Sequence, residues 1–180
     1  RQPLVQIIRG ILLIAEVCVM VFAFINLGLV ETHAVFSCYP LMVAALSGPV
    51  LREKVGWRRW TAIGIGFVGI LIVLKPGMTV FSPYALFPLI SALMFGFYGL
   101  LTRFVARKDS ANVSFFWTGV VGAIAITPFG LTHWQPMTAP DWGWMLALCI
   151  TSVTAHFLMI KAYAVAEAGA IQPFAYLQLV

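Results

Sequence analysis

Charged side chains are scarce in this chain. Lys, Arg, Asp and Glu together make up 9% of the 180 residues, whereas a soluble domain carries roughly 25% to keep its surface hydrated. Only six residues are acidic, while hydrophobic residues make up 62% of the chain and the mean hydropathy is +0.98. This shortage excludes a water-facing exterior of ordinary size, so the sequence predicts that a lipid bilayer surrounds most of the protein.

Cysteines are also few, and the excess of basic residues has a membrane explanation. Cys18, Cys38 and Cys149 all lie in apolar runs, where an odd number indicates small hydrophobic side chains rather than a disulfide framework. A net charge of +5 in a soluble protein would suggest nucleic acid. In a membrane protein basic residues gather in cytoplasmic loops, so we expect no nucleic-acid partner.

Long apolar runs fill most of the sequence. About 20 apolar residues are needed to span the bilayer as a helix, and six stretches meet or approach that length. They run over about 10–30, 32–51, 57–74, 83–102, 111–131 and 142–162. A seventh begins near Ala168. Because the chain starts without Met and stops inside this last run, we interpret it as a fragment of a longer protein.

The basic residues predict one orientation. If the first residues are cytoplasmic, ten of the eleven basic residues fall on that side and only Lys75 falls outside, an asymmetry typical of inserted helices. The ten are Arg1, Arg9, Arg52, Lys54, Arg58, Arg59, Arg103, Arg107, Lys108 and Lys161. We therefore expect a multi-pass membrane protein whose first residues are cytoplasmic.

A weak internal repeat points to two halves of opposite orientation. At an offset of 136 residues Glu31 aligns with Glu167, and Ala34 aligns with Ala170. The paired helices are five spans apart, and an odd number reverses direction across the bilayer. Inverted halves are typical of secondary transporters, which bind solute between them near the midplane. Chance similarity between apolar stretches is the alternative.

Two blocks of sequence resemble the EamA-type drug/metabolite transporters. Residues 51–77 carry a Glu after a helix, a Trp-containing basic loop and a Gly-rich helix ending in Pro-Gly, and residues 156–163 with 170–180 look like the matching part of a second repeat. The resemblance implies an all-α, polytopic membrane bundle of ten helices in two five-helix repeats, located in a bacterial cytoplasmic (inner) membrane. Residues 1–77 would end the first repeat, and residues 81–180 would begin the second. Arg52 departs from the pattern, which usually has a small residue there.

One motif in the sequence mimics a nucleotide site. Residues 64–69 read Gly-x-Gly-x-x-Gly, but a dinucleotide site needs this pattern between a strand and a helix, with an acidic residue about 20 positions later. The motif here lies in an expected spanning helix without such an acid. Small residues that allow close helix contact explain it better, and we expect no cofactor.

Glu16 is the one acidic residue inside an expected span, about 9 Å below the helix start at residue 10. Intramembrane acids are costly and commonly mark a proton or solute path. His156 lies at a comparable depth. One hypothesis is that Glu16 and His156 form a protonatable pair coupled to transport, and the alternative is a polar contact that only fixes packing.

Further polar residues are candidates for a solute path or for gating. Aromatic walls with a few polar groups suit amphipathic organic solutes. The path candidates are Tyr39, Tyr98, Tyr163, Gln172, Tyr176 and Gln178. We interpret Glu31, Glu53 and Glu167 as helix-end or gating residues. No metal site and no catalytic residue is expected.

The leading function is therefore secondary transport of a small organic metabolite or drug-like solute by alternating access. Because no ATP-binding motif is present, a gradient, including one of protons, would supply any energy. Two other classes stay open: an intramembrane enzyme and a non-transporting membrane scaffold subunit. The enzyme would need catalytic groups paired in a wet pocket, and the expected spans contain no acidic pair or Cys cluster.

Overall fold

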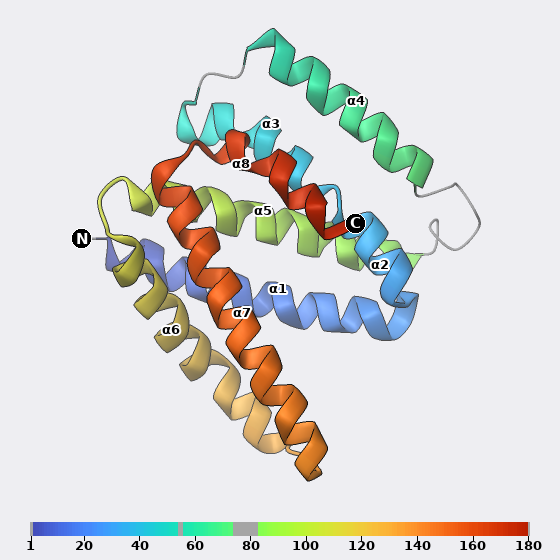
Figure 1. Ribbon diagram of the computed structural model, residues 1–180, viewed down its shortest axis with the longest axis vertical. Coiled ribbons are helices and arrows are strands. Elements are labelled where there is room, and N and C mark those ends of the chain that lie inside the picture. Colours follow the sequence, from blue (N-terminus) through green and yellow to red (C-terminus); the bar gives the residue numbers. More distant parts are fainter. Residues whose placement is uncertain (1, 54–55, 74–82, 180) are drawn as a thin grey trace.

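The computed structural model describes residues 2–53, 56–73 and 83–179. Within these ranges the chain forms helices and no strand, as Figure 1 shows. The α-helices are α1 (Pro3–Leu27), α2 (Leu29–Phe36), α3 (Tyr39–Leu51), α4 (Trp57–Val73), α5 (Leu86–Ala106), α6 (Ala111–Thr132), α7 (Ala139–Val165) and α8 (Ala168–Ala175). Two short 3₁₀ helices, η1 (Pro83–Ala85) and η2 (Tyr176–Leu179), adjoin α5 and α8. The predicted all-α class is confirmed.

Five segments are long and apolar enough to cross a bilayer, so the predicted multi-pass character is also confirmed. They are Pro3–Leu27, Leu29–Leu51, Pro83–Ala106, Ala111–Thr132 and Ala139–Val165. The predicted span at 57–74 corresponds to α4, of which 17 residues are described, and the predicted seventh helix corresponds to α8. The Pro-Gly pair at 76–77 lies outside the described residues.

The first helix begins earlier than predicted. It starts at Pro3 rather than near residue 10, with the proline in its first turn, where no backbone donor is needed. Gly28, at φ 95°, ends it, since a left-handed turn favours glycine. Arg9, expected in a loop, is therefore a helical residue. Glu31, interpreted as a helix-end or gating residue, lies in the first turn of α2.

The predicted span at 32–51 is a broken helix. α2 ends at Phe36, Ser37 and Cys38 form a turn, and α3 begins at Tyr39. Pro40 explains the break, because it has no N–H to donate to the carbonyl of Phe36 four residues before. Non-helical backbone at membrane depth is tolerated where protein buries it, and all of residues 35–40 are buried.

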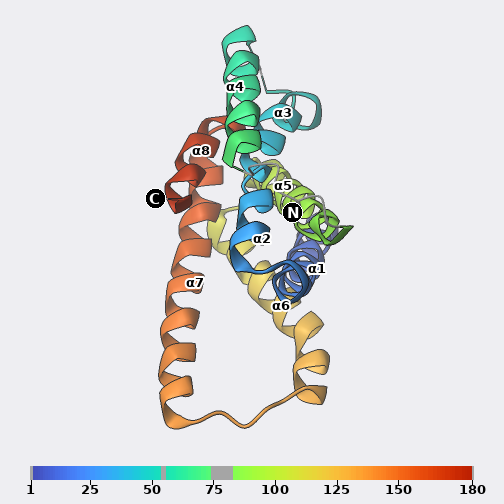
Figure 2. The same ribbon diagram turned by 90° about the vertical axis from the view of Figure 1, so that its right-hand side faces the viewer.

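Helix α5 is central to the bundle. It packs against α1, α2, α3, α6, α7 and α8. In Figures 1 and 2, α6 and α7 lie on one side of α5, and α3, α8 and α4 lie on the other. The apolar core joins α3 to α5 and α7 through residues such as Val43, Leu100 and Tyr163. Many large apolar side chains face outward, among them Ile25, Ile65 and Trp144, as a lipid-facing surface requires.

Side-chain contacts show which helix ends lie together. Gln6 near the start of α1 donates to Asp109, just before α6, at 3.2 Å. Arg107 after α5 donates to the Leu51 carbonyl at the end of α3 at 2.7 Å. Arg103 donates to the Tyr163 carbonyl near the end of α7 at 3.0 Å. These ends carry most of the basic residues, so the described basic loops gather at one end of the bundle.

The glycine motif at 64–69 lies entirely in α4. It therefore does not join a strand to a helix, as a dinucleotide site requires. A methyl group added at Gly66 would come within 2.9 Å of Leu41 on α3, whereas Gly64 and Gly69 face open space. The close-contact explanation therefore holds for Gly66 and not for its two neighbours. The three cysteines are free, as predicted.

Candidate functional site

A fully buried arginine lies at the centre of a polar cluster between α1, α5 and α6. The guanidinium of Arg9 has no exposed surface. It donates to the Gln6 amide oxygen at 2.8 and 3.2 Å and to the Tyr98 hydroxyl at 3.1 Å. Further contacts join it to the hydroxyls of Thr102 and Thr118 and to the Ser114 carbonyl.

Every one of these acceptors is neutral. Arginine stays protonated in proteins, yet among the described residues no carboxylate pairs with Arg9. The nearest link to an acid is indirect: the Gln6 amide nitrogen donates to Asp109 at 3.2 Å while its oxygen accepts from Arg9. The cluster thus holds a buried positive charge through hydrogen bonds to neutral groups and through the Tyr98 ring, whose centroid lies 5.2 Å from the guanidinium carbon, which demands that each partner be well oriented.

His156 on α7 joins this cluster through Tyr98. The Tyr98 hydroxyl lies 2.9 Å from the His156 Nε2 and 3.1 Å from an Arg9 nitrogen. Tyr98 itself is fully buried. The Tyr98 hydroxyl therefore links the His156 imidazole on α7 to the Arg9 guanidinium on α1.

Glu16 lies deeper than predicted and has a different partner. It is 13 residues after Pro3, about 20 Å along the helix at 1.5 Å per residue, rather than about 9 Å. Its side chain is 5% exposed and accepts a short hydrogen bond from the Ser91 hydroxyl on α5. Glu16 and His156 therefore contact Ser91 and Tyr98 respectively, and the described hydrogen bonds do not pair them directly.

Two ion pairs connect parts of the chain that are far apart in sequence. Glu53, just after α3, accepts from Arg103 on α5 at 3.4 Å and from the backbone N–H of Ala168 at the start of α8 at 3.2 Å. Arg59 on α4 pairs with Glu167, the N-cap residue of α8, at 3.2 Å. The hydrogen bond from Ala168 to Glu53 and the ion pair between Arg59 and Glu167 tether α8 to residues of the predicted first repeat.

The tyrosine and glutamine candidates do not form one group. Tyr163 accepts from the Gln172 amide at 3.3 Å, and its hydroxyl occupies the space beside Gly99, where an added methyl would come within 2.6 Å. Tyr39 packs against the Phe36 and Phe95 rings, each at 4.9 Å between centroids. Gln178 falls in η2, and its side chain lies outside what the structure describes.

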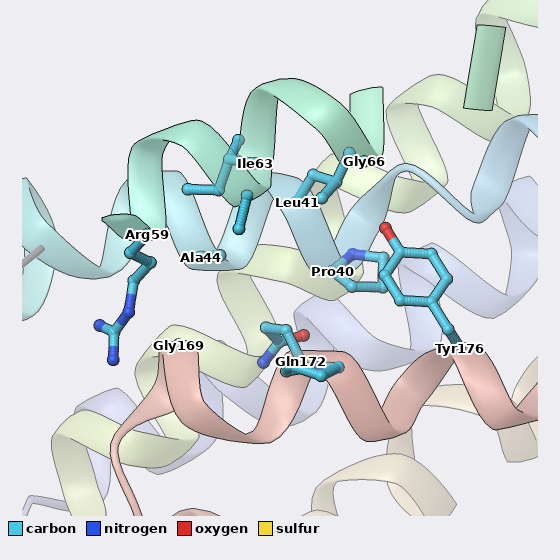
Figure 3. A pocket seen from close by; sticks show the side chains of 11 residues that line it. Pro40, Leu41, Ala44, Arg59, Ile63, Gly66, Gly169, Gln172 and Tyr176 are labelled. Carbon is cyan, nitrogen blue, oxygen red and sulfur yellow. The ribbon is translucent and has the colours of Figure 1, made fainter. Parts of the chain in front are cut away.

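Tyr176 and Gln172 face a cavity between α3, α4 and α8, shown in Figure 3. Its volume is about 270 Å³, and apolar groups form most of its wall. Arg59 lies at one edge of the cavity, while the Tyr176 hydroxyl points toward Pro40 and α4 from the opposite side. Glu31, the remaining candidate, is not among the residues that line this cavity. It lies close to Gly28 in the first turn of α2.

Arg9 and Gln6 are not among the candidates predicted from the sequence, because the predicted first helix begins near residue 10 and leaves both residues outside it. Their spacing of three residues puts both on one face of a helix, and Pro3 before them is a helix-start signal. Together these would have extended α1 toward the chain start. No comparable signal in the sequence marks Ser91 as the partner of Glu16.

The chain is similar to curated bacterial transporters along nearly its whole length. It is 29% identical over 180 residues, 99% of the chain, to an S-adenosylmethionine uptake transporter of Rickettsia bellii. It is 33% identical over 149 residues, 78% of the chain, to a riboflavin transporter of Vibrio cholerae, and 21% identical over 176 residues, 97% of the chain, to a pseudopaline exporter of Pseudomonas aeruginosa.

The matches cover only part of these relatives: 62%, 47% and 62% of their lengths respectively. No family model matches the chain, and no solved structure matches it. All three relatives are named as transporters or exporters, and none of the three is named as an enzyme. The resemblance inferred from the two sequence blocks is confirmed, since along nearly its whole length the chain is similar to EamA-type transporters of the drug/metabolite transporter superfamily.

Proposed function

We propose that this chain is the central part of a secondary transporter that moves a small organic metabolite across a bacterial inner membrane by alternating access. The observation that carries the proposal is the set of buried polar side chains inside apolar helices. Glu16 with Ser91, and Arg9 with Tyr98 and His156, lie on helices that otherwise turn apolar groups outward. Polar groups in membrane segments are costly and generally mark a path or a binding site.

The named relatives support a metabolite as the solute. They are a transporter of S-adenosylmethionine, one of riboflavin and an exporter of pseudopaline. These are polar or amphipathic organic molecules, so the proposed class is a small polar metabolite, moved in either direction.

The proposal includes the domain arrangement and orientation expected from the sequence. Residues 1–77 would end one repeat and residues 81–180 would begin a second of opposite orientation, with the first residues cytoplasmic. The gathering of basic residues at one end of the bundle supports the orientation. The hydrogen bond from the Ala168 backbone to Glu53 and the ion pair between Arg59 and Glu167 tether α8 to the proposed first repeat, as contacts between two halves would.

An uptake screen of the full-length protein tests the function. A bacterial host with and without the protein is supplied with labelled S-adenosylmethionine, riboflavin and amino acids. Protein-dependent uptake or efflux of at least one solute is expected. If a well-expressed, correctly inserted protein moves none of a widened panel, transport is excluded in favour of the scaffold class.

Proton coupling is a separate part of the proposal and rests on Glu16. Its carboxyl has one polar partner among the described residues, the Ser91 hydroxyl, so proton binding would remove an isolated negative charge from an apolar region. Glu16→Gln should abolish the pH dependence of uptake, while Ser91→Ala, which keeps the carboxyl, should retain it. Unchanged pH dependence in Glu16→Gln would end the coupling idea.

A further inference from the structure

The cavity between α3, α4 and α8 brings together residues from both proposed repeats. α3 contributes Pro40 and Leu41, α4 contributes Arg59 and Ile63, and α8 contributes Gln172. Figure 3 shows these side chains around a common space. The wall is mostly apolar, and its volume of about 270 Å³ is near the lower end of ligand pockets, roughly 300 Å³.

Two buried polar atoms around this cavity, the Arg59 Nη1 and the Tyr176 hydroxyl, have no hydrogen-bond partner among the described residues. The Gln172 amide nitrogen donates to Tyr163 and to the Ala168 carbonyl, and the hydrogen bonds of the described residues include none to its oxygen. Buried polar groups are nearly always bonded, and each exception calls for an explanation. A polar ligand in the cavity would supply the missing partners.

The positive charge of Arg59 at the cavity wall favours a ligand with a negative charge. Among the lining residues Arg59 alone is charged, and its Nη2 is shared with Glu167 at 3.2 Å while Nη1 is unpartnered. A planar guanidinium matches a carboxylate well. Gly169 leaves space for the Arg59 guanidinium, since a methyl group added at Gly169 would come within 2.8 Å of Nη1.

We propose that this cavity binds a small carboxylate-bearing solute with an apolar body. The carboxylate pairs with Arg59, the body packs against Leu41 and Ile63, and a donor group of the solute bonds to the Gln172 oxygen. This inference rests on the proposed transport function and narrows its solute class. Because Arg59 also holds Glu167 at the start of α8, the solute's carboxylate competes with the contact between α4 and α8.

Binding to the purified full-length protein tests the site with two matched probes, indole-3-acetate and its uncharged amide. The acid should bind at least about tenfold more tightly than the amide, since a hydrogen bond to a charged group contributes that much. Arg59→Gln should remove the difference, whereas Arg58→Gln, an exposed neighbour of equal charge, should keep it. Equal binding of the two probes, no binding of the acid, or a full preference in Arg59→Gln overturns the proposal.

Three further variants test the site without removing the charge of Arg59. Two replace a glycine, and the third places a large side chain in the cavity. Gly169→Ala should displace the guanidinium and weaken the acid at least tenfold, while Gly143→Ala, with open space around it, should not. Ala62→Trp should raise the KM of whichever solute the uptake screen identifies. If that solute is transported with unchanged KM, the cavity inference fails while transport stands, and if no solute is transported, the proposed function itself fails.

Discussion

Arg9 and Arg59 are both arginines of the bundle, but their surroundings are opposite. Arg9 is completely buried, and all its hydrogen-bonding contacts go to neutral groups of α1, α5 and α6. Arg59 borders a cavity, its side chain is 26% exposed, and one of its nitrogens has no hydrogen-bond partner among the described residues. A cation whose donors are all used orders its surroundings, whereas one with an unused donor is available to a ligand. We therefore propose that Arg9 holds helices together and that Arg59 binds the solute.

The largest effect should come from Arg9→Lys. Lysine has three donors and no planar fork, so Gln6 and the Ser114 carbonyl would lose partners around a buried charge. We expect the full-length protein to lose about 3 kcal/mol or more of stability, measured by denaturant unfolding in detergent. Arg58→Lys, on the exposed side of α4, is the control. A stable Arg9→Lys protein would show that the cluster tolerates loose geometry.

A smaller loss is expected from Gly99→Ala on α5. The new methyl would lie 2.6 Å from the Tyr163 hydroxyl, and the shift should break the bond to Gln172. Overpacking of this kind costs about 1 to 3 kcal/mol. Gly96→Ala, one turn away, meets only a Val43 methyl at 3.5 Å and should leave the unfolding midpoint nearly unchanged. Equal behaviour of the two variants would refute the close approach of Tyr163.

The Glu53–Arg103 pair should show measurable coupling. Glu53 is 4% exposed in its side chain and also accepts from the Ala168 backbone. A double-mutant cycle with Glu53→Gln and Arg103→Gln should give a coupling energy of about 1 to 2 kcal/mol. A value near zero would mean that the two side chains act independently in the membrane-embedded protein.

The smallest effect is expected for the Arg59–Glu167 pair. Both side chains are partly exposed, at 26% and 49%, and exposed ion pairs contribute less than about 1 kcal/mol. The same cycle with Arg59→Gln and Glu167→Gln should therefore give a lower coupling energy than Glu53 and Arg103. A stronger coupling than in the buried pair would argue that Arg59 is mainly structural, against a ligand-binding role.

The sequence predicted the places and order of the apolar helices well, apart from the break between α2 and α3, because apolar length is a local property. It failed where a partner from another helix decides the outcome. Arg9 was assigned to a loop because basic residues usually avoid spans, and only the acceptors on α5 and α6 make its burial tolerable. Glu16 was recognised as unusual, but its partner Ser91 could not be predicted, since serine is common in membrane helices. The break at Ser37 is caused by Pro40. The sequence alone does not predict it, because a proline breaks a span only where neighbouring helices bury the freed backbone.

Solute flux in liposomes that contain only the purified full-length protein is the decisive measurement for the proposed transport function. Labelled S-adenosylmethionine and riboflavin should be followed at inside and outside pH values set independently, in wild type, Glu16→Gln and Ser91→Ala. We predict flux above empty liposomes for at least one metabolite of this class, with a dependence on the pH gradient that Glu16→Gln abolishes and Ser91→Ala keeps. Flux equal to empty liposomes for every metabolite tested, from protein shown to be folded and inserted, would contradict the account.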